Sequence, residues 1–131
     1  CAAYGKKVTD VAELVQGFHF EEYTDTLLRE LSTGNRKKAF LITAFALKPK
    51  LLLLDEPVNG LDFRSTEYLY QKILGYKEHG TVLFSSHILE SITLTSDRVF
   101  VLEDGKIRQT FEGGQVGAAD IREALHDEND R

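Results

Sequence analysis

The stretch Leu51-Leu52-Leu53-Leu54-Asp55-Glu56-Pro57 decides the fold of this chain. Four consecutive leucines have no polar side, so they predict a short strand buried on both faces, as in the centre of a parallel sheet. Pro57 lacks a backbone N–H and ends the strand. Asp55 and Glu56 therefore stand at its carboxyl end, where parallel sheets place ligand sites and where a phosphate-bound Mg²⁺ would offset two adjacent charges. Taken alone, the stretch could also be a core strand followed by surface acids.

Composition limits the kind of protein that this sequence encodes. The chain has 131 residues and 42% hydrophobic content, which suits a single soluble globular domain. A net charge of -5 argues against a general nucleic-acid binder, and Arg36-Lys37-Lys38 is predicted to be a solvated helix start. Cys1 is the only cysteine, which excludes an internal disulfide and fits the reducing cytoplasm. The longest apolar stretch, Ala39 to Leu47, is too short to span a bilayer, so we expect any membrane link to come through a partner.

Residues 1–48 are expected to form a helical subdomain. Thr9 or Asp10 can cap a first helix that ends at Gly17, and a second helix is predicted over Glu22 to Glu30. Residues 32–35 read as a loop before a strongly apolar helix, Arg36 to Leu47, which Lys48-Pro49 ends. A plain amphipathic helix pair is the alternative for the first part.

The region 49–112 is expected to form an α/β core. After the leucine strand, a turn over 58–62 leads to a helix from about Ser65 to Lys77, with a buried stripe of Tyr68, Leu69, Ile73 and Leu74. Residues 81–85 predict a second buried strand, parallel to the first, which brings Ser86 and His87 to the same sheet edge as Asp55. The remaining predicted elements are a short helix at 88–94, an antiparallel hairpin with strands at 99–102 and 107–111, and, within the final region 113–131, a helix at 118–126.

Four motifs in this order resemble the ATP-binding domain of ABC transporters. They are Leu31 to Asn35, Leu51 to Pro57, Asn59 to Asp62, and Ser85 to His87, and the hairpin text DRVFVLEDGKI at 97–107 is also typical of these subunits. The resemblance covers roughly residues 20–112 and implies a partial P-loop NTPase fold of the RecA-like type. In this comparison the leucine strand is the Walker B strand.

The resemblance assigns roles to individual residues. Asp55 would hold Mg²⁺ through its water shell, and Glu56 would polarise the water that attacks the γ-phosphate of ATP. His87 would be the switch histidine that contacts the γ-phosphate, although a histidine after a strand is often structural. Asp62 would belong to the loop that crosses the dimer interface, with a helix N-cap as its structural alternative.

Ser32, Thr33, Gly34 and Asn35 match the signature loop, which in the family binds ATP held by the other subunit. A hydroxyl and backbone N–H groups at a helix start form an anion site, although a simple Ser cap with a glycine turn would have the same local shape. Thr33 stands where the family has its first glycine, and Asn35 stands in place of glutamine. Thr33 adds a branched side chain where backbone should approach phosphate closely.

The sequence contains no G-x-x-x-x-G-K-[ST] motif, and Gly5-Lys6-Lys7 is best read as a loop. It also contains no methionine, so we expect a fragment: the C-terminal half of an ATP-hydrolysing subunit, inactive alone. The resemblance implies ATP and Mg²⁺ as cofactors, and a second ATP-binding subunit and transmembrane permease subunits as partners, at the inner face of the cell membrane. The alternatives are a soluble ABC-type ATPase acting on nucleic acid or ribosomes, and a non-catalytic interaction fragment.

Overall fold

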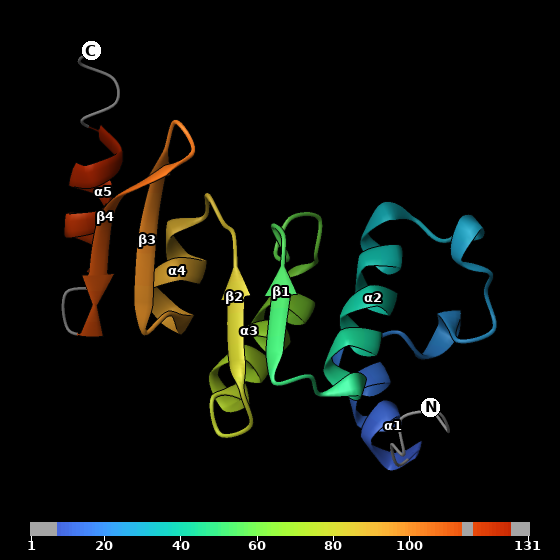
Figure 1. The fold of residues 1–131 in the computed structure, drawn as a ribbon. Helices are drawn as coiled ribbons and strands as arrows, with labels where there is room; N and C mark the ends of the chain where they lie inside the picture. The colour runs from blue at the N-terminus through green and yellow to red at the C-terminus, as the bar shows by residue number, and fades with distance from the viewer. Residues whose placement is uncertain (1–7, 114–116, 127–131) are drawn as a thin grey trace. The chain divides into compact units, whose positions relative to one another are not determined.

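The computed structural model describes residues 8–113 and 117–126. The chain divides into two compact units, Cys1–Ser85 and Ser86–Arg131 (Figure 1). The division falls directly after the second strand, inside the region 49–112 that the sequence assigns to one core. The expected loop at Gly5-Lys6-Lys7 lies outside the described residues, as does the chain end after residue 126.

The first unit contains the helical segments and the parallel strands. Its elements are α1 (Val8–Gly17), the 3₁₀ helices η2 (Glu21–Tyr23) and η3 (Leu28–Glu30), α2 (Thr33–Leu47), β1 (Leu51–Leu54), α3 (Phe63–Tyr76) and β2 (Thr81–Phe84). Gly17 ends α1 as predicted, and a β-carbon at this position would collide with the ring of Tyr68. The predicted cap at Thr9 or Asp10 is wrong, because α1 already includes Val8 and both residues lie in its first turn.

The prediction of a helix over Glu22 to Glu30 is wrong. The segment forms η2 and η3, and Leu27 between them is extended, with φ -65° and ψ 138°. Thr24, Asp25 and Thr26 are weak helix formers. The Thr24 hydroxyl instead donates to the carbonyl of Glu21 at 3.1 Å. No residue of either 3₁₀ helix is buried, so no apolar face stabilises a longer helix here.

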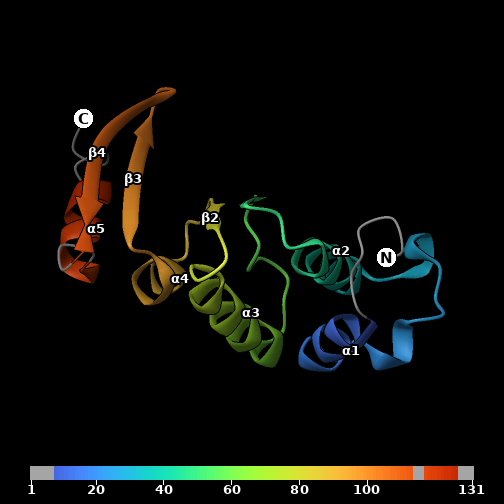
Figure 2. The same ribbon diagram turned by 60° about the horizontal axis from the view of Figure 1, so that its bottom comes forward.

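β1 and β2 pair in parallel, with Leu51 opposite Thr81 and Leu54 opposite Phe84, which confirms the predicted parallel unit. The expectations that β1 is buried on both faces and that β2 is a buried strand are wrong. Leu52 is 5% exposed, whereas Leu53 and Leu83 are 64% and 53% exposed. The reason is that α3 covers one face of this strand pair (Figure 2), and successive side chains of a strand alternate between faces. Within the described residues, β1 pairs with β2 alone.

α3 buries one stripe of side chains against the rest of the first unit. Leu69 and Ile73 are buried as predicted, and Tyr68 is half-buried. The prediction for Leu74 is wrong, since it is 41% exposed. The stripe continues instead to Tyr76, which lies on the same helical face as Leu69 and Ile73 and donates its hydroxyl to the carbonyl of Pro49 at 2.6 Å.

The second unit has its own small core and confirms the predicted hairpin and helices. Its elements are α4 (Leu89–Thr95), β3 (Arg98–Glu103), β4 (Lys106–Glu112) and α5 (Ala118–His126). β3 and β4 pair antiparallel, and Asp104 and Gly105 at the turn have φ values of 49° and 74°, as a type I′ turn requires. The buried apolar side chains of this core are those of Val99, Val101, Phe111 and Ile121. Among the described helices of both units, none has the length and apolar character needed to cross a membrane.

Candidate functional site

Asp55 and Glu56 follow β1, and one hydroxyl group joins them to the end of β2. Ser85 Oγ donates to Asp55 Oδ1 at 2.5 Å and accepts from the backbone N–H of Glu56 at 2.9 Å. The parallel register explains this contact, because the pair Leu54 and Phe84 is the last in the ladder and the next residues of both strands lie together. Ser85 is not among the predicted site residues, although it begins the motif Ser85 to His87. The signal for it is its position one residue after β2, level with Asp55.

The backbone of Glu56 has an unusual conformation. Its φ is 43°, in the left-handed region that residues with a β-carbon rarely adopt. Such a conformation costs about 1–3 kcal/mol and persists where neighbouring groups hold it. The residue is half-buried, and its carboxylate oxygen Oε2 is shielded from solvent. Strain of this kind is concentrated at functional sites, which makes Glu56 the notable residue of this strand end.

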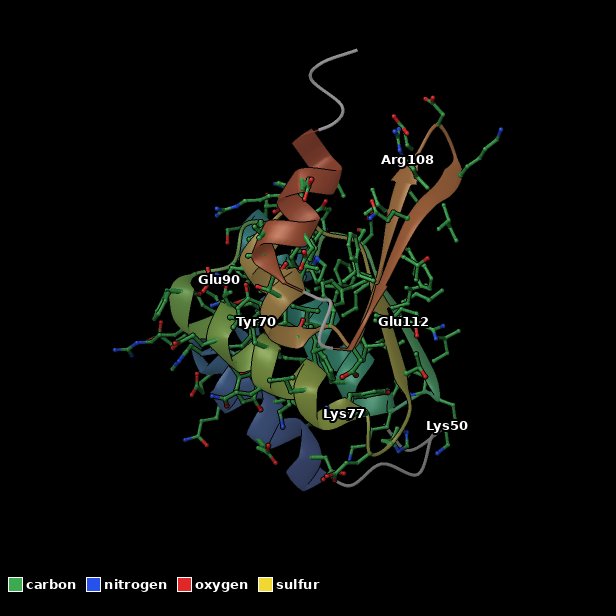
Figure 3. All side chains as sticks on the ribbon, turned by 90° about the vertical axis from the view of Figure 1, so that its left-hand side faces the viewer. Lys50, Tyr70, Lys77, Glu90, Arg108 and Glu112 are labelled. Atoms are coloured by element: carbon green, nitrogen blue, oxygen red, sulfur yellow. The ribbon has the colours of Figure 1, made fainter. Side chains whose placement is uncertain are left out.

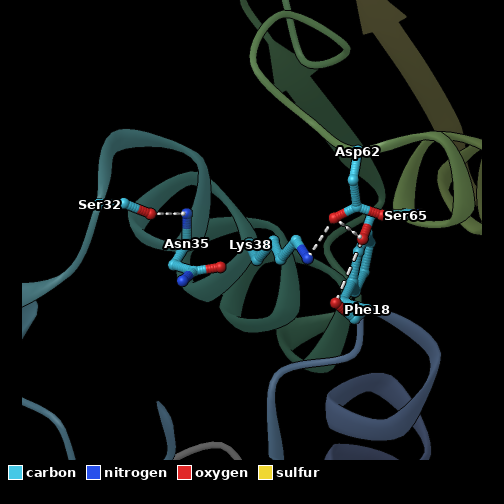
Figure 4. Close-up of polar contacts among 6 residues, drawn as sticks. All are labelled: Phe18, Ser32, Asn35, Lys38, Asp62 and Ser65. Carbon is cyan, nitrogen blue, oxygen red and sulfur yellow. Dashed lines mark hydrogen bonds and ion pairs between the residues drawn. The ribbon is translucent and has the colours of Figure 1, made fainter. Parts of the chain in front are cut away.

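The three basic residues at the start of α2 all make internal contacts. The prediction of a solvated helix start is wrong for Lys37, which is half-buried, and for Lys38, which is buried, whereas Arg36 is exposed. Arg36 donates to the carbonyl of Leu28 at 3.1 Å. Lys37 donates its ammonium group to two carbonyls, each 2.7 Å away, in the segment that follows β1. Lys38 is only 6% exposed, and its Nζ lies 2.5 Å from a carboxylate oxygen of Asp62 (Figure 4). Their long side chains reach backbone carbonyls and a carboxylate that lie far away in sequence.

The residues of the expected signature loop form a helix start. Ser32 is the N-cap of α2, and its Oγ accepts from the backbone N–H of Asn35 at 3.2 Å (Figure 4). Thr33, Gly34 and Asn35 therefore lie in the first turn of α2, and the prediction of a loop is wrong because the serine cap starts the helix at Thr33. Ser32 and Thr33 are exposed.

Gly34 faces the segment that follows β1. A β-carbon at this position would lie 2.7 Å from the carbonyl oxygen of Gly60, closer than real β-carbon contacts. The helix start and the turn at Gly60 therefore meet backbone to backbone. Since α2 and this turn belong to the same unit, Gly34 has a structural role inside one chain.

Asp62 is the N-cap of α3. Its Oδ1 accepts from the backbone N–H of Ser65 at 2.9 Å, and its Oδ2 accepts from the Ser65 hydroxyl at 3.0 Å. The fully buried Ser65 also donates to the carbonyl of Phe18 at 3.2 Å (Figure 4). Burial alone would raise the pKa of the Asp62 carboxyl, but the hydrogen bonds from Lys38 and Ser65 and the Lys38 charge outweigh it and hold this pKa well below its usual range.

Asp62→Asn should make the protein less sensitive to acid. Because the pKa of Asp62 is lower in the folded state, its charge stabilises the fold above the unfolded pKa of about 3.9, and this stabilisation is lost as the pH falls through the folded pKa. Asparagine keeps the N-cap but not the charge opposite Lys38, so we expect a loss of about 1–3 kcal/mol at pH 7. Urea unfolding between pH 2 and pH 7 measures both effects.

The matched control is Asp25→Asn, which removes an exposed carboxylate in the turn after η2. It should keep the acid sensitivity of the wild type. An Asp62→Asn protein whose unfolding free energy falls as steeply below pH 4 as that of the wild type would contradict the role of the ion pair.

His87 lies in the second unit, where hydroxyl groups shape the backbone around it. The oxygens of Ser86 and Ser91 are 2.7 Å apart, and Ser86 Oγ accepts from the backbone N–H of Ile88 at 3.0 Å. Ser91, fully buried, donates to the carbonyl of Ile88 at 2.7 Å. The His87 side chain is exposed. Because Asp55 belongs to the other unit, the expected meeting of these two residues stays a prediction.

The residues at the end of β1 suit a magnesium ion bound together with a nucleotide. No group of three or more His, Cys, Asp and Glu side chains that could hold a metal is found in the described part of the chain. Mg²⁺ in nucleotide sites needs fewer protein ligands, since one or two carboxylates hold it together with waters and phosphate oxygens. Asp55 is exposed, and Ser85 fixes one of its oxygens. This single, oriented carboxylate fits that kind of site.

A groove of about 420 Å³ lies between α2 and β1 in the first unit. Its lining is mostly apolar and includes Thr33, Lys37, Phe40, Leu53, Asp55 and Pro57. Phe40 and Leu53 are 59% and 64% exposed. The groove is therefore an exposed apolar surface, and only a few of its lining residues, such as Asp55, are polar.

Known proteins match most of the chain. Residues 4–93 match the family model described as "AAA domain, putative AbiEii toxin, Type IV TA system". AlbC of Bacillus subtilis, which is named a putative ABC transporter ATP-binding protein, is 41% identical over 105 residues, which are 79% of this chain and 44% of AlbC. The energy-coupling factor transporter ATP-binding protein EcfA2 of Clostridium perfringens is 36% identical, covering 82% of this chain and 40% of EcfA2. The chain thus spans less than half the length of these relatives.

Solved structures agree with the fold. The ATP-binding subunit of an ABC transporter superposes with a TM-score of 0.75 and 26% identity, covering 95% of this chain and 52% of that chain. A dimeric ATP-binding cassette bound to ADP and Pi has a TM-score of 0.69 and 21% identity, covering 79% and 46%, and supports the fold alone. The predicted α/β fold of the P-loop NTPase type is confirmed. By its family match this chain belongs to the AAA domain family, and the relatives and the solved structure that it resembles are ATP-binding proteins of ABC transporters.

Proposed function

We propose that this chain is the C-terminal portion of an ATP-binding and ATP-hydrolysing subunit that powers a membrane transporter. The observation that carries the proposal is the group at the carboxyl ends of two parallel strands: the Asp55 carboxylate, Glu56 and the Ser85 hydroxyl that connects them. The relatives are about twice as long as this chain, which supports a longer subunit that supplies the phosphate-binding loop.

In this proposal the two carboxylates have different tasks. Asp55, oriented by Ser85, would hold Mg²⁺ through bound water, and the ion would neutralise negative charge on the phosphate oxygens. Glu56 would accept a proton from the water that attacks the γ-phosphate, so its backbone must point the carboxylate towards that water. His87 would contact the γ-phosphate. Phosphoryl transfer depends mainly on such positioning and charge.

The start of α2 would meet ATP held by a second ATP-binding subunit. Ser32 and Thr33 are exposed at the N-terminus of a 15-residue helix, where backbone N–H groups favour an anion. Gly34 and Asn35 would hold the first turn of α2 in the shape that presents these N–H groups. Asp62 would lie near the subunit interface. The remaining partners in the proposal are transmembrane permease subunits, which would keep the subunit at the cytoplasmic face of the membrane.

The test uses the full-length subunit, encoded by the reading frame extended upstream of Cys1, with and without its co-expressed permease. We expect Mg²⁺-dependent ATP hydrolysis and recovery in the membrane fraction only when the permease is present. Asp55→Asn should raise the Mg²⁺ concentration for half-maximal activity by about tenfold, because a neutral amide holds the waters bound to Mg²⁺ less strongly than a carboxylate does. Failure to bind ATP would overturn the proposal, and co-sedimentation with ribosomes in place of membranes would favour the soluble alternative.

A further inference from the structure

We infer that Lys37 is a positioning residue that sets the backbone of Glu56 and links it to the start of α2. The inference rests on the proposed function, in which Glu56 acts on water. Lys37 has no role in the resemblance that identified the other site residues, and its sequence context predicts only a surface cation. Its contacts assign it a different task.

One ammonium group bridges the turn that follows β1. Lys37 Nζ lies 2.7 Å from the carbonyl oxygen of Glu56 and 2.7 Å from that of Asn59. Pro57 and Val58 between them are buried. Hydrogen bonds from a charged donor are about twice as strong as neutral ones, and two of them close this turn. Lys37 itself is half-buried, which limits competition from water.

The two backbone groups of Glu56 are thereby held from opposite sides. Its N–H donates to Ser85 Oγ at 2.9 Å, and its carbonyl accepts from Lys37. These bonds hold the residue at its φ of 43°. Since a residue with a β-carbon prefers negative φ, loss of the Lys37 bonds should let Glu56 relax and turn its side chain away.

The same helix face makes two further contacts with this segment. Gly34 lies against the carbonyl of Gly60, and Lys38 pairs with Asp62. Positions 37 and 38 come three and four residues after position 34, so they lie on the same side of α2 as Gly34. The first turns of α2 and the segment 56–62 therefore form one packed body. Lys37 is the member of this body that reaches Glu56 directly, so it connects the exposed start of α2 with the proposed base.

The test is Lys37→Met in the full-length subunit, since methionine keeps the apolar stem and removes the ammonium group. We expect kcat to fall by about tenfold or more, with KM for MgATP within about twofold of the wild type, as for a residue that acts on the chemical step. Lys37→Arg should restore part of the activity, because arginine still donates to carbonyls. Lys37→Gln serves as a second variant should the methionine protein fold poorly. Activities are normalised to the folded fraction.

Lys50→Met is the matched control. Lys50 (Figure 3) also donates to a backbone carbonyl, that of His79 at 2.9 Å, but it precedes β1, whereas Glu56 follows the opposite end of that strand. Its loss should leave kcat unchanged. An equal fall in kcat in the Lys50 and Lys37 variants would show a general stability effect and overturn the inference.

A double variant gives the sharpest outcome. If Lys37 acts through Glu56, then Lys37→Met added to Glu56→Gln should lower kcat by less than about twofold, because the group it positions is already lost. Losses that multiply would overturn the inference. Wild-type kcat in Lys37→Met together with an inactive Glu56→Gln would overturn the inference and leave the proposed function intact. Wild-type kcat in Glu56→Gln would instead overturn the proposed catalytic role itself.

Discussion

Glu56→Gln in the full-length subunit should bind ATP normally and lose about 10²–10⁴-fold in turnover, the usual contribution of general-base catalysis. Glutamine has nearly the same shape as glutamate, and both backbone groups of residue 56 keep their partners on Ser85 and Lys37. The neutral amide, however, does not take a proton from water. Calorimetric titration with ATP and single-turnover hydrolysis measure the two effects separately.

Glu67→Gln is the control for this prediction. Glu67 is an exposed residue of α3, so the same chemical change there should leave turnover unchanged. Turnover of Glu56→Gln within about threefold of the wild type would assign the Glu56 carboxylate a structural role, since a lost base costs far more than that.

The parts of the fold that the sequence predicts correctly are those with a strong local pattern. The leucine strand, the strand at 81–84 and the intervening helix confirm the parallel unit. Asp104-Gly105 predicts the hairpin because a glycine and an aspartate tolerate positive φ. Exposure of Leu53 could not be predicted, because four leucines in a row indicate two buried faces and cannot show that only one face is covered by a helix here.

The residues that hold the candidate site in place are harder to predict from the sequence than its acidic residues. Asp55 and Glu56 stand out because they follow an apolar strand. Lys37 and Lys38 do not, since their partners lie 19 or more residues away and a lysine at a helix start is usually solvated. Only the packing of α2 against the segment after β1 brings these acceptors within reach of the two lysines. The left-handed backbone of Glu56 has no signal in the sequence for the same reason.

Gly34→Ala should lower the unfolding free energy by about 1–3 kcal/mol and also reduce turnover, because the added methyl group overpacks a tight contact. The new β-carbon would lie 2.7 Å from the carbonyl oxygen of Gly60, and a backbone atom cannot move aside as a flexible side chain can. The turn that Lys37 holds at Asn59 would shift with Gly60 and disturb Glu56. Thermal unfolding and turnover of the folded fraction are the measurements.

Thr33→Arg separates this internal effect from contact with a second subunit. Thr33 is exposed, one residue before Gly34 and in the same turn of α2, so a large cation there should leave the unfolding free energy within about 0.5 kcal/mol of the wild type. If the start of α2 meets ATP on another subunit, the arginine should still block ATP-driven dimerisation in sedimentation experiments. Normal dimerisation of Thr33→Arg, together with lost activity in Gly34→Ala, would mean that this helix start acts only inside its own chain, as the support of the segment that carries Glu56.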